Sequence, residues 1–203
     1  LIVMIASQSF ANNIIVGNLG SKIQGEVIST FSYPWSLSFL DSDRLLVATK
    51  PGKLWLLDSA GTKTAVKNMV NVEYGGQGGM GDVVPHPNYS ENYYVYFSYI
   101  TSDDGGQTRY AVVDRAILRD LSFPNLENIE RIWKQFPAVK GKGHFSHRIA
   151  FGPKGSAHEN KIFITSGDRQ MQDPAQMWET NFGKIIRLND DGSVPRDNPF
   201  KNR

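Results

Sequence analysis

The segment SLSFLDSDRLLVATKPGKLWLLD, residues 36–58, contains three short apolar stretches separated by polar turns. Residues 36–40, 44–49 and 53–57 are rich in leucine, β-branched and aromatic side chains, which favour strands. The intervening triplets Asp-Ser-Asp and Lys-Pro-Gly consist of residues that favour turns. The segment therefore predicts three consecutive antiparallel strands.

The same pattern of strand, polar turn and second strand returns further along the chain. The later strand candidates are residues 81–84, 93–99, 109–119, 148–151, 161–166 and 183–188. Units of roughly 40–65 residues with three or four strands each are typical of propeller blades. Only residues 173–180 favour a short helix, with Pro174 suited to its first position. The sequence predicts an all-β fold, a β-propeller of four-stranded antiparallel blades.

Three predicted blades are fewer than the roughly four to eight that a closed ring uses. We therefore expect residues 12–203 to form a partial β-propeller domain, about the first half of a ring, within an amino-terminal portion of a longer protein. Residues 1–11, LIVMIASQSFA, end in the small-residue pattern of a secretory cleavage site. They are expected to be the remnant of a signal peptide, which implies a periplasmic or secreted protein; a buried first strand is the alternative.

The composition excludes several functional classes. The 203 residues carry a net charge of only +2, with lysine and arginine dispersed, so no nucleic-acid-binding surface is expected. The absence of cysteine excludes disulfides and thiolate chemistry. No later apolar run is long enough to cross a bilayer.

A histidine and an aspartate stand at the ends of two neighbouring predicted strands. His144 lies just before residues 148–151, and Asp168 follows residues 161–166 in a Ser-Gly-Asp-Arg turn. If these strands pair, a potential base and a carboxylate that could orient it come together. Asp168 could also be simply a turn residue.

The remaining histidines have simpler interpretations. His86 lies in a Pro-His-Pro turn, where a turn or capping role is expected, and His158 lies in a polar loop exposed to solvent. His144 and His147 have the spacing of a zinc pair, but residues three apart in an extended segment point to opposite faces, and no third ligand is near in sequence.

Three ordered blocks, residues 33–58, 75–99 and 143–200, resemble the glucose/sorbosone dehydrogenase family. These soluble quinoproteins are six-bladed propellers that oxidise aldose sugars at the anomeric carbon to lactones. The resemblance implies pyrroloquinoline quinone (PQQ) and calcium as cofactors. It also implies a sugar substrate and an electron acceptor of unidentified kind; whether the protein forms a homodimer stays open.

The resemblance also implies roles for individual residues. His144 matches the family's catalytic base in an H-x-x-x-R setting, with Arg148 at the family's arginine, and Asp168 matches the aspartate that would orient the base. Gln77, inside Gly-Gly-Gln-Gly-Gly, matches a glutamine that touches the cofactor. His147 departs from the family, which usually has a small residue there.

The family's calcium ligands and the cations that hold the PQQ carboxylates lie in later blades, so we assign no metal ligand and expect this chain alone to be inactive.

The glycine-rich loop is not a phosphate loop, because no Gly-Lys-Ser/Thr follows it. Trp35, Trp55, Trp133 and Trp178 are expected to pack in the core or between blades rather than to serve as stacking platforms for a sugar. The alternatives are a non-catalytic propeller binding module and a calcium-dependent sugar lactonase-like propeller.

Overall fold

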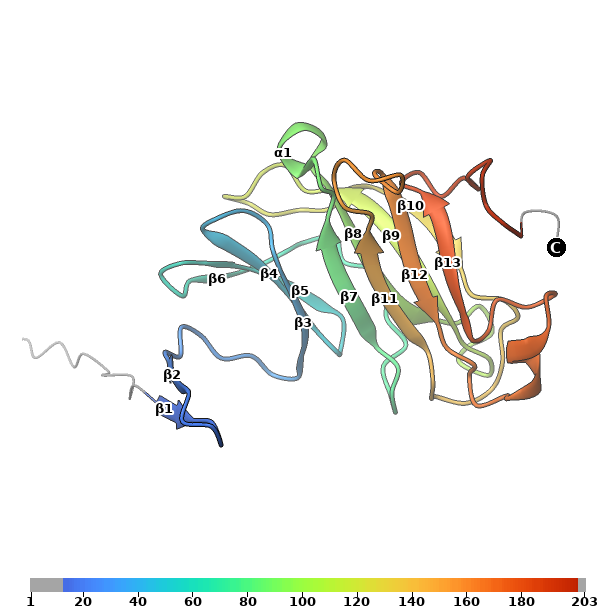
Figure 1. Cartoon of the computed structure of the whole chain (residues 1–203), viewed down its shortest axis with the longest axis horizontal. Coiled ribbons are helices and arrows are strands. Elements are labelled where there is room, and N and C mark those ends of the chain that lie inside the picture. The colour runs from blue at the N-terminus through green and yellow to red at the C-terminus, as the bar shows by residue number, and fades with distance from the viewer. Residues whose placement is uncertain (1–12, 201–203) are drawn as a thin grey trace, which may run out of the picture.

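A computed structural model of the chain describes residues 13–200, which form antiparallel β-sheets joined by turns and loops (Figure 1). The first sheet consists of β3 (Pro34–Phe39), β4 (Arg44–Thr49), β5 (Lys53–Asp58) and β6 (Lys63–Ala65). The second sheet consists of β7 (Met80–Pro85), β8 (Tyr94–Thr101), β9 (Tyr110–Ile117) and β10 (Glu127–Lys134). The third sheet consists of β11 (Ser146–Phe151), β12 (Lys161–Ser166) and β13 (Lys184–Asn189).

Each of these sheets is a meander in which neighbouring strands follow one another in the chain. The predicted all-β fold with four-stranded antiparallel blades is therefore confirmed, and the third blade has three strands within the described residues. We number the blades 1 to 3 in chain order. Blade 2 lies between the others, since its first strand, β7, contacts both β3 and β11. In Figure 1, β7 and β11 run side by side in the same direction.

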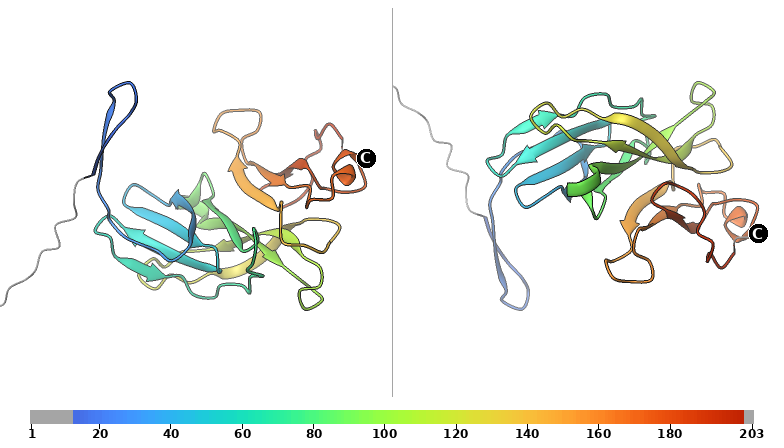
Figure 2. Two further views of the ribbon diagram at one scale, coloured as in Figure 1. Left: turned by 90° about the horizontal axis from the view of Figure 1, so that it is seen from below. Right: turned by 90° about the horizontal axis from the view of Figure 1, so that it is seen from above.

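The remaining elements are small. A hairpin of β1 (Asn13–Val16) and β2 (Lys22–Gly25) stands off from the blades (Figure 2). The helix α1 (Tyr89–Asn92) follows β7, and the 3₁₀-helix η1 (Asp173–Gln176) lies where residues 173–180 predicted a longer helix. The helix stops early because Met177 adopts an extended conformation.

The sequence did not predict β6 and β10. Half of the residues in the β10 segment ENIERIWK are charged, and five of its first six side chains from Glu127 are exposed. An outer edge strand can carry such side chains because only one of its sides pairs with another strand. β6 is only three residues long and its side chains are all exposed.

Successive side chains of β8 alternate between two apolar clusters that form the core. Val95, Phe97 and Tyr99 pack into the apolar cluster shared with blade 1, and Tyr96 and Ile100 pack into the cluster shared with blade 3. Side chains of a strand alternate between the two faces of its sheet, so a strand buried on both faces is apolar throughout. Blade 2 is thus held between its neighbours, which fixes the relative positions of the loops at the blade ends.

Residues 1–11, where the sequence predicts a signal-peptide remnant, lie outside the described residues. Between residues 13 and 200, no helix is long and apolar enough to span a bilayer.

Candidate functional site

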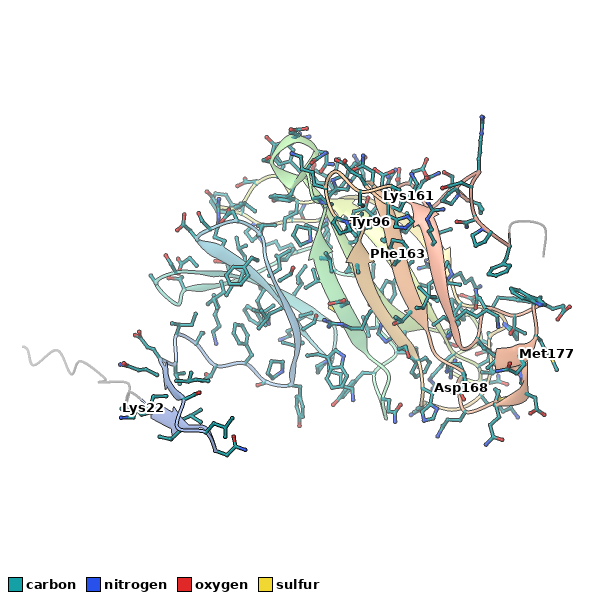
Figure 3. All side chains as sticks on the ribbon, in the orientation of Figure 1. Lys22, Tyr96, Lys161, Phe163, Asp168 and Met177 are labelled. Carbon is teal, nitrogen blue, oxygen red and sulfur yellow. The ribbon has the colours of Figure 1, made fainter. Side chains whose placement is uncertain are left out.

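A pocket of about 550 Å³ opens at one end of the blades. It is lined by Trp35, Gln77, His144, Phe145, Ser146, His147, Gly167 and Asp168. Figure 3 places Asp168 at the end of β12 opposite to Lys161, on the side of the molecule away from α1. The lining residues come from the start of β3, the loop before β7, the entry to β11 and the turn after β12. These chain positions share one end because the first strands of successive blades run in the same direction.

His144 and Asp168 form a direct hydrogen bond in this pocket. The distance between His144 Nδ1 and Asp168 Oδ1 is 2.8 Å, and 50% of the His144 side chain is exposed. A carboxylate on Nδ1 favours the tautomer in which Nδ1 carries the proton and Nε2 has a free lone pair. The pair therefore has the geometry of a base held in one tautomer by a carboxylate, and the catalytic role of both residues remains a prediction.

The Asp168 carboxylate is held in its charged form. The amide of Gln170 donates to Asp168 Oδ1 at 3.0 Å, and this bond, followed by the His144 contact, lowers the pKa of Asp168 below its usual value. A charged carboxylate can stabilise an imidazolium that forms when the neighbouring histidine accepts a proton.

Gln77 contacts the backbone of the same histidine. The side-chain Oε1 of Gln77 accepts a hydrogen bond from the backbone amide of His144 at 2.7 Å. The backbone amide of Gln77 donates to the Lys142 carbonyl at 2.8 Å. The structure thus brings Gln77, His144 and Asp168 together. Gln77 contributes to fixing the position of His144, a contact that the sequence did not predict, and its contact with a cofactor remains a prediction.

The glycine-rich loop needs its glycines because other chain segments pack closely against its backbone. A Cβ atom at Gly76 would lie 2.8 Å from the Lys142 carbonyl oxygen, and one at Gly79 would lie 2.3 Å from the Lys50 carbonyl oxygen. Both glycines also have positive φ, which side chains tolerate poorly. Neighbouring chain segments therefore account for these two glycines.

His147 is the buried counterpart of His144. Only 4% of it is exposed, and its Nδ1 lies 2.8 Å from Ser98 Oγ. Its ring occupies the space over Gly81, where a Cβ atom would lie 1.8 Å from the ring. Burial lowers the pKa of His147 to about 4, so the ring is neutral near pH 7. The departure from a small residue at this position therefore fills the pocket wall with a neutral ring.

The segment that carries both histidines has an unusual backbone. His144, Ser146 and His147 have φ angles of 49°, 61° and 62°, in the left-handed region that favours glycine. Residues in such conformations persist only when the surrounding contacts determine them, and they concentrate at functional sites. Gly167 makes one such contact possible, because a Cβ atom there would lie 1.9 Å from the His144 carbonyl oxygen.

Arg148 and Asp82 join blade 3 to blade 2. Arg148 Nη1 lies 3.1 Å from Asp82 Oδ1, and the Ile149 amide donates to Asp82 Oδ2 at 2.9 Å. Asp82 is 2% exposed, and burial raises the pKa of its carboxyl above the usual value. Arg148 is therefore placed as a structural partner of blade 2.

Trp35 corrects a sequence prediction. It was expected to pack in the core or between blades, but 54% of it is exposed and it lines the pocket. Lys50 Nζ lies 4.8 Å from the centre of its ring and donates to the Gly76 carbonyl at 2.6 Å, which links the indole to the Gln77 loop. Trp178 is 44% exposed and lies outside the core, with the centre of its ring 4.7 Å from that of Phe200. Trp55 is partly buried with its ring against Phe31, and Trp133, which is 8% exposed, packs in the core as expected.

The other two histidines lie away from this pocket. His86 is buried, and its Nδ1 accepts from the Asn88 amide at 3.0 Å, which agrees with the predicted turn role. His158 is exposed, as expected, with its ring against Phe163. Within residues 13–200, no group of three or more histidine, cysteine, aspartate or glutamate side chains could hold a metal ion.

Comparison with known proteins supports the resemblance found in the sequence. Residues 31–203 match the family described as Glucose / Sorbosone dehydrogenase. The aldose sugar dehydrogenase YliI of Escherichia coli is 31% identical over 171 residues, which covers 83% of this chain and 44% of that protein. The chain thus spans less than half the length of this relative.

Solved structures have the same fold. A crystal structure of a glucose dehydrogenase superimposes with a TM-score of 0.77 at 31% identity, covering 84% of this chain and 48% of that chain. The PQQ-bound form of an aldose sugar dehydrogenase from Streptomyces coelicolor superimposes with a TM-score of 0.72 at 24% identity, covering 95% of this chain and 54% of that chain.

Proposed function

Since this chain belongs to the glucose/sorbosone dehydrogenase family, we propose that it forms one wall of the site of an aldose sugar dehydrogenase. In this proposal the enzyme is PQQ-dependent and oxidises its sugar at the anomeric carbon to a lactone. The observation that carries the proposal is the hydrogen bond of 2.8 Å between His144 and Asp168 at the mouth of an open pocket.

His144 acts as the general base. Asp168 holds the proton on Nδ1, so Nε2 can accept the proton from the anomeric hydroxyl of a bound aldose. As the histidine becomes charged, the Asp168 carboxylate, which is held ionised by the Gln170 amide, stabilises the imidazolium. Gln77 fixes the backbone of the base through the His144 amide.

The pocket walls fit part of a flat, polar cofactor. Gln77 offers an amide, Trp35 offers an aromatic face, and both line the pocket together with His144. When bound, PQQ would supply a quinone as hydride acceptor, and Ca²⁺ would supply Lewis-acid polarisation. Gln77 and Trp35 would contact the cofactor on the side that this chain provides.

The described residues do not supply the whole cofactor site. The side chains that line the pocket within residues 13–200 include no lysine or arginine to neutralise the carboxylates of PQQ, and these residues contain no cluster of metal ligands. We therefore propose that a full-length protein of the relatives' size provides the calcium ligands and the cationic contacts from its further blades. A periplasmic or secreted location, with a small electron acceptor or an electron-transfer protein as partner, belongs to the same proposal.

Reconstitution of the full-length protein with PQQ and Ca²⁺ tests the function. Bleaching of an artificial electron acceptor on addition of aldoses is expected, and none is expected without PQQ. His144→Gln should lower kcat by about 100-fold or more, the usual scale for a general base. His158→Gln is the matched control and should leave kcat unchanged, because His158 lies outside the pocket.

Two outcomes would contradict the proposal. Full activity of His144→Gln would remove this histidine from the reaction. Binding of PQQ without oxidation of any aldose would favour a non-catalytic propeller, and hydrolysis of sugar lactones in the presence of Ca²⁺ alone would favour a lactonase.

A further inference from the structure

We infer that Arg169 is a second residue, besides Gln77, that positions His144, by holding the loop that precedes it, and this inference rests on the proposed role of His144 as the base. Arg169 directly follows Asp168 in the chain, yet its side chain turns away from the pocket and is 2% exposed. Its backbone lies in the left-handed region, with φ of 57°.

The Arg169 guanidinium donates hydrogen bonds to three backbone carbonyls. Nε donates to the Gly143 carbonyl at 3.0 Å, Nη2 donates to the Gly141 carbonyl at 3.0 Å, and Nη1 donates to the Arg109 carbonyl at 2.7 Å. Between residues 13 and 200, the partners found for this side chain are carbonyl oxygens and an aromatic ring, and none is a carboxylate. A planar fork of donors suits this arrangement better than the point charge of a lysine.

The guanidinium also packs on the ring next to His144. Its central carbon lies 3.7 Å from the centre of the Phe145 ring, which is the distance of a close stacking contact. The Arg169 amide donates to the His144 carbonyl at 3.2 Å, and the Gly167 amide donates to the Phe145 carbonyl at 3.0 Å. Arg169 therefore contacts the residue before His144, the carbonyl of His144 and the residue after it.

The loop needs such a restraint because its own sequence provides little. Residues 140–143 read Lys-Gly-Lys-Gly, and Gly141 has a φ of 94°. Glycine has no side chain to pack and loses the most conformational freedom on ordering. Without the two bonds from Arg169 to Gly141 and Gly143, the loop would sample several conformations, and the distance between His144 and Asp168 would no longer be fixed.

Arg169 is a buried cation that has no carboxylate partner among the contacts found for it in the described part of the chain, so burial destabilises its charged form. Burial lowers the pKa of Arg169 to about 10, and the group stays charged near pH 7. Because a salt bridge is not the source of its placement, the contacts with the His144 loop are the ones that a substitution removes.

The test compares Arg169→Met with Arg131→Met. Methionine keeps apolar volume against Phe145 but donates no hydrogen bond. Arg131 is a matched control, because it also holds buried partners, Asp114 and Tyr99, but on β10, away from the His144 loop. Both variants should be less stable, whereas only Arg169→Met should disturb His144.

The first readout is the ¹⁵N chemical shift pattern of the His144 ring in the 203-residue chain. The wild type and Arg131→Met should show the Nδ1–H tautomer, and Arg169→Met should show a mixture with the Nε2–H tautomer. In the reconstituted full-length enzyme, Arg169→Met should lower kcat by about 10–100-fold with KM within about twofold, because misplacement of a base affects the chemical step. Millimolar guanidinium should restore part of kcat to Arg169→Ala.

The outcomes separate this inference from the proposed function. An unchanged His144 tautomer in Arg169→Met, or an equal change in Arg131→Met, would overturn the positioning role whatever the activity. If the full-length protein oxidises no aldose but the tautomer responds to Arg169→Met alone, the proposed reaction fails while Arg169 still positions His144.

Discussion

At the scale of single residues, the candidate site places two histidines in opposite environments. His144 is half exposed and paired with Asp168, whereas His147 is buried against Ser98 and Gly81. The first environment keeps an imidazole available to a substrate proton, and the second keeps a ring neutral and inaccessible. The difference follows from burial, which disfavours the charged form of histidine.

His147 makes the protein sensitive to acid. Its pKa is about 4 in the folded protein and 6.5 without the fold, so the unfolded chain binds a proton that the folded protein does not. The stability from the neutral ring is therefore complete above pH 6.5 and is lost as the pH falls toward 4. We expect the free energy of unfolding to fall by about 2–3 kcal/mol between pH 7 and pH 4.5 from this group.

Urea unfolding at both pH values measures this effect. His147→Asn tolerates the positive φ and has no titrating ring, so its stability should depend less on pH by that amount. Its stability at pH 7 is expected to be lower than that of the wild type because the bond to Ser98 is altered. Identical pH dependence in both proteins would mean that His147 is not the acid-sensitive group.

At the scale of elements, the contact between β7 and β11 fixes the pocket. Gln77 precedes β7, and His144 precedes β11, so any shift between these strands changes the distance between the two residues. Asp82 of β7 accepts the Ile149 amide of β11 and lies 3.1 Å from Arg148. A buried acceptor on β7 is thus one direct link that holds these two strands in their relative position.

Asp82→Ala should lower the free energy of unfolding by about 2–3 kcal/mol, because the buried Ile149 amide loses its acceptor and Arg148 loses its partner. Asp82→Asn, which keeps a carbonyl oxygen, should be less destabilised. Asp197→Ala is the control: Asp197 pairs with Arg187 at the surface, and its removal should leave stability nearly unchanged. Equal losses in Asp82→Ala and Asp197→Ala would contradict the role of Asp82 as a link between blades.

At the scale of the whole molecule, the three blades form an arc. Apolar side chains are exposed on both of its outer blades, on β3 of blade 1 and on β13 of blade 3. On β3, Trp35, Leu37 and Phe39 are 54%, 62% and 68% exposed, and on β13 Ile185 is 71% exposed. Each blade of a repeat protein normally buries such a face on its neighbour. The pocket lies where the loops of all three blades meet at one end of their strands, so its described walls come from these blades.

The 203-residue chain by itself should bind PQQ weakly. Its pocket offers Trp35, Gln77 and His144, but no lysine or arginine among the lining residues that the structure describes. Desolvated carboxylates need cationic partners for tight binding. Titration of PQQ into the chain, with and without Ca²⁺, should give a dissociation constant far above micromolar, and tight calcium-dependent binding would show that the chain is functionally complete.

Much of the architecture could be predicted from the sequence. The strands over residues 44–49 and 161–166 were predicted with the bounds that the structure has, because their alternation and turns are local properties of the chain. The positions of His144 and Asp168 at neighbouring strand ends were also local, since β11 and β12 are joined by a single turn region and pair directly.

Only the tertiary structure decided what separate blades do to one another. Gln77 and His144 are 67 residues apart, yet they share a hydrogen bond, and Ser98 reaches His147 across 49 residues. The exposure of Trp35, the burial of His147 and the carbonyl contacts of Arg169 all depend on which blade packs beside which. Residue type and periodicity predict where a strand begins and which of its faces is apolar, because these are local properties of the chain. Burial and contacts across blades depend on packing between segments that are far apart in the sequence, so they arise only when the blades are assembled.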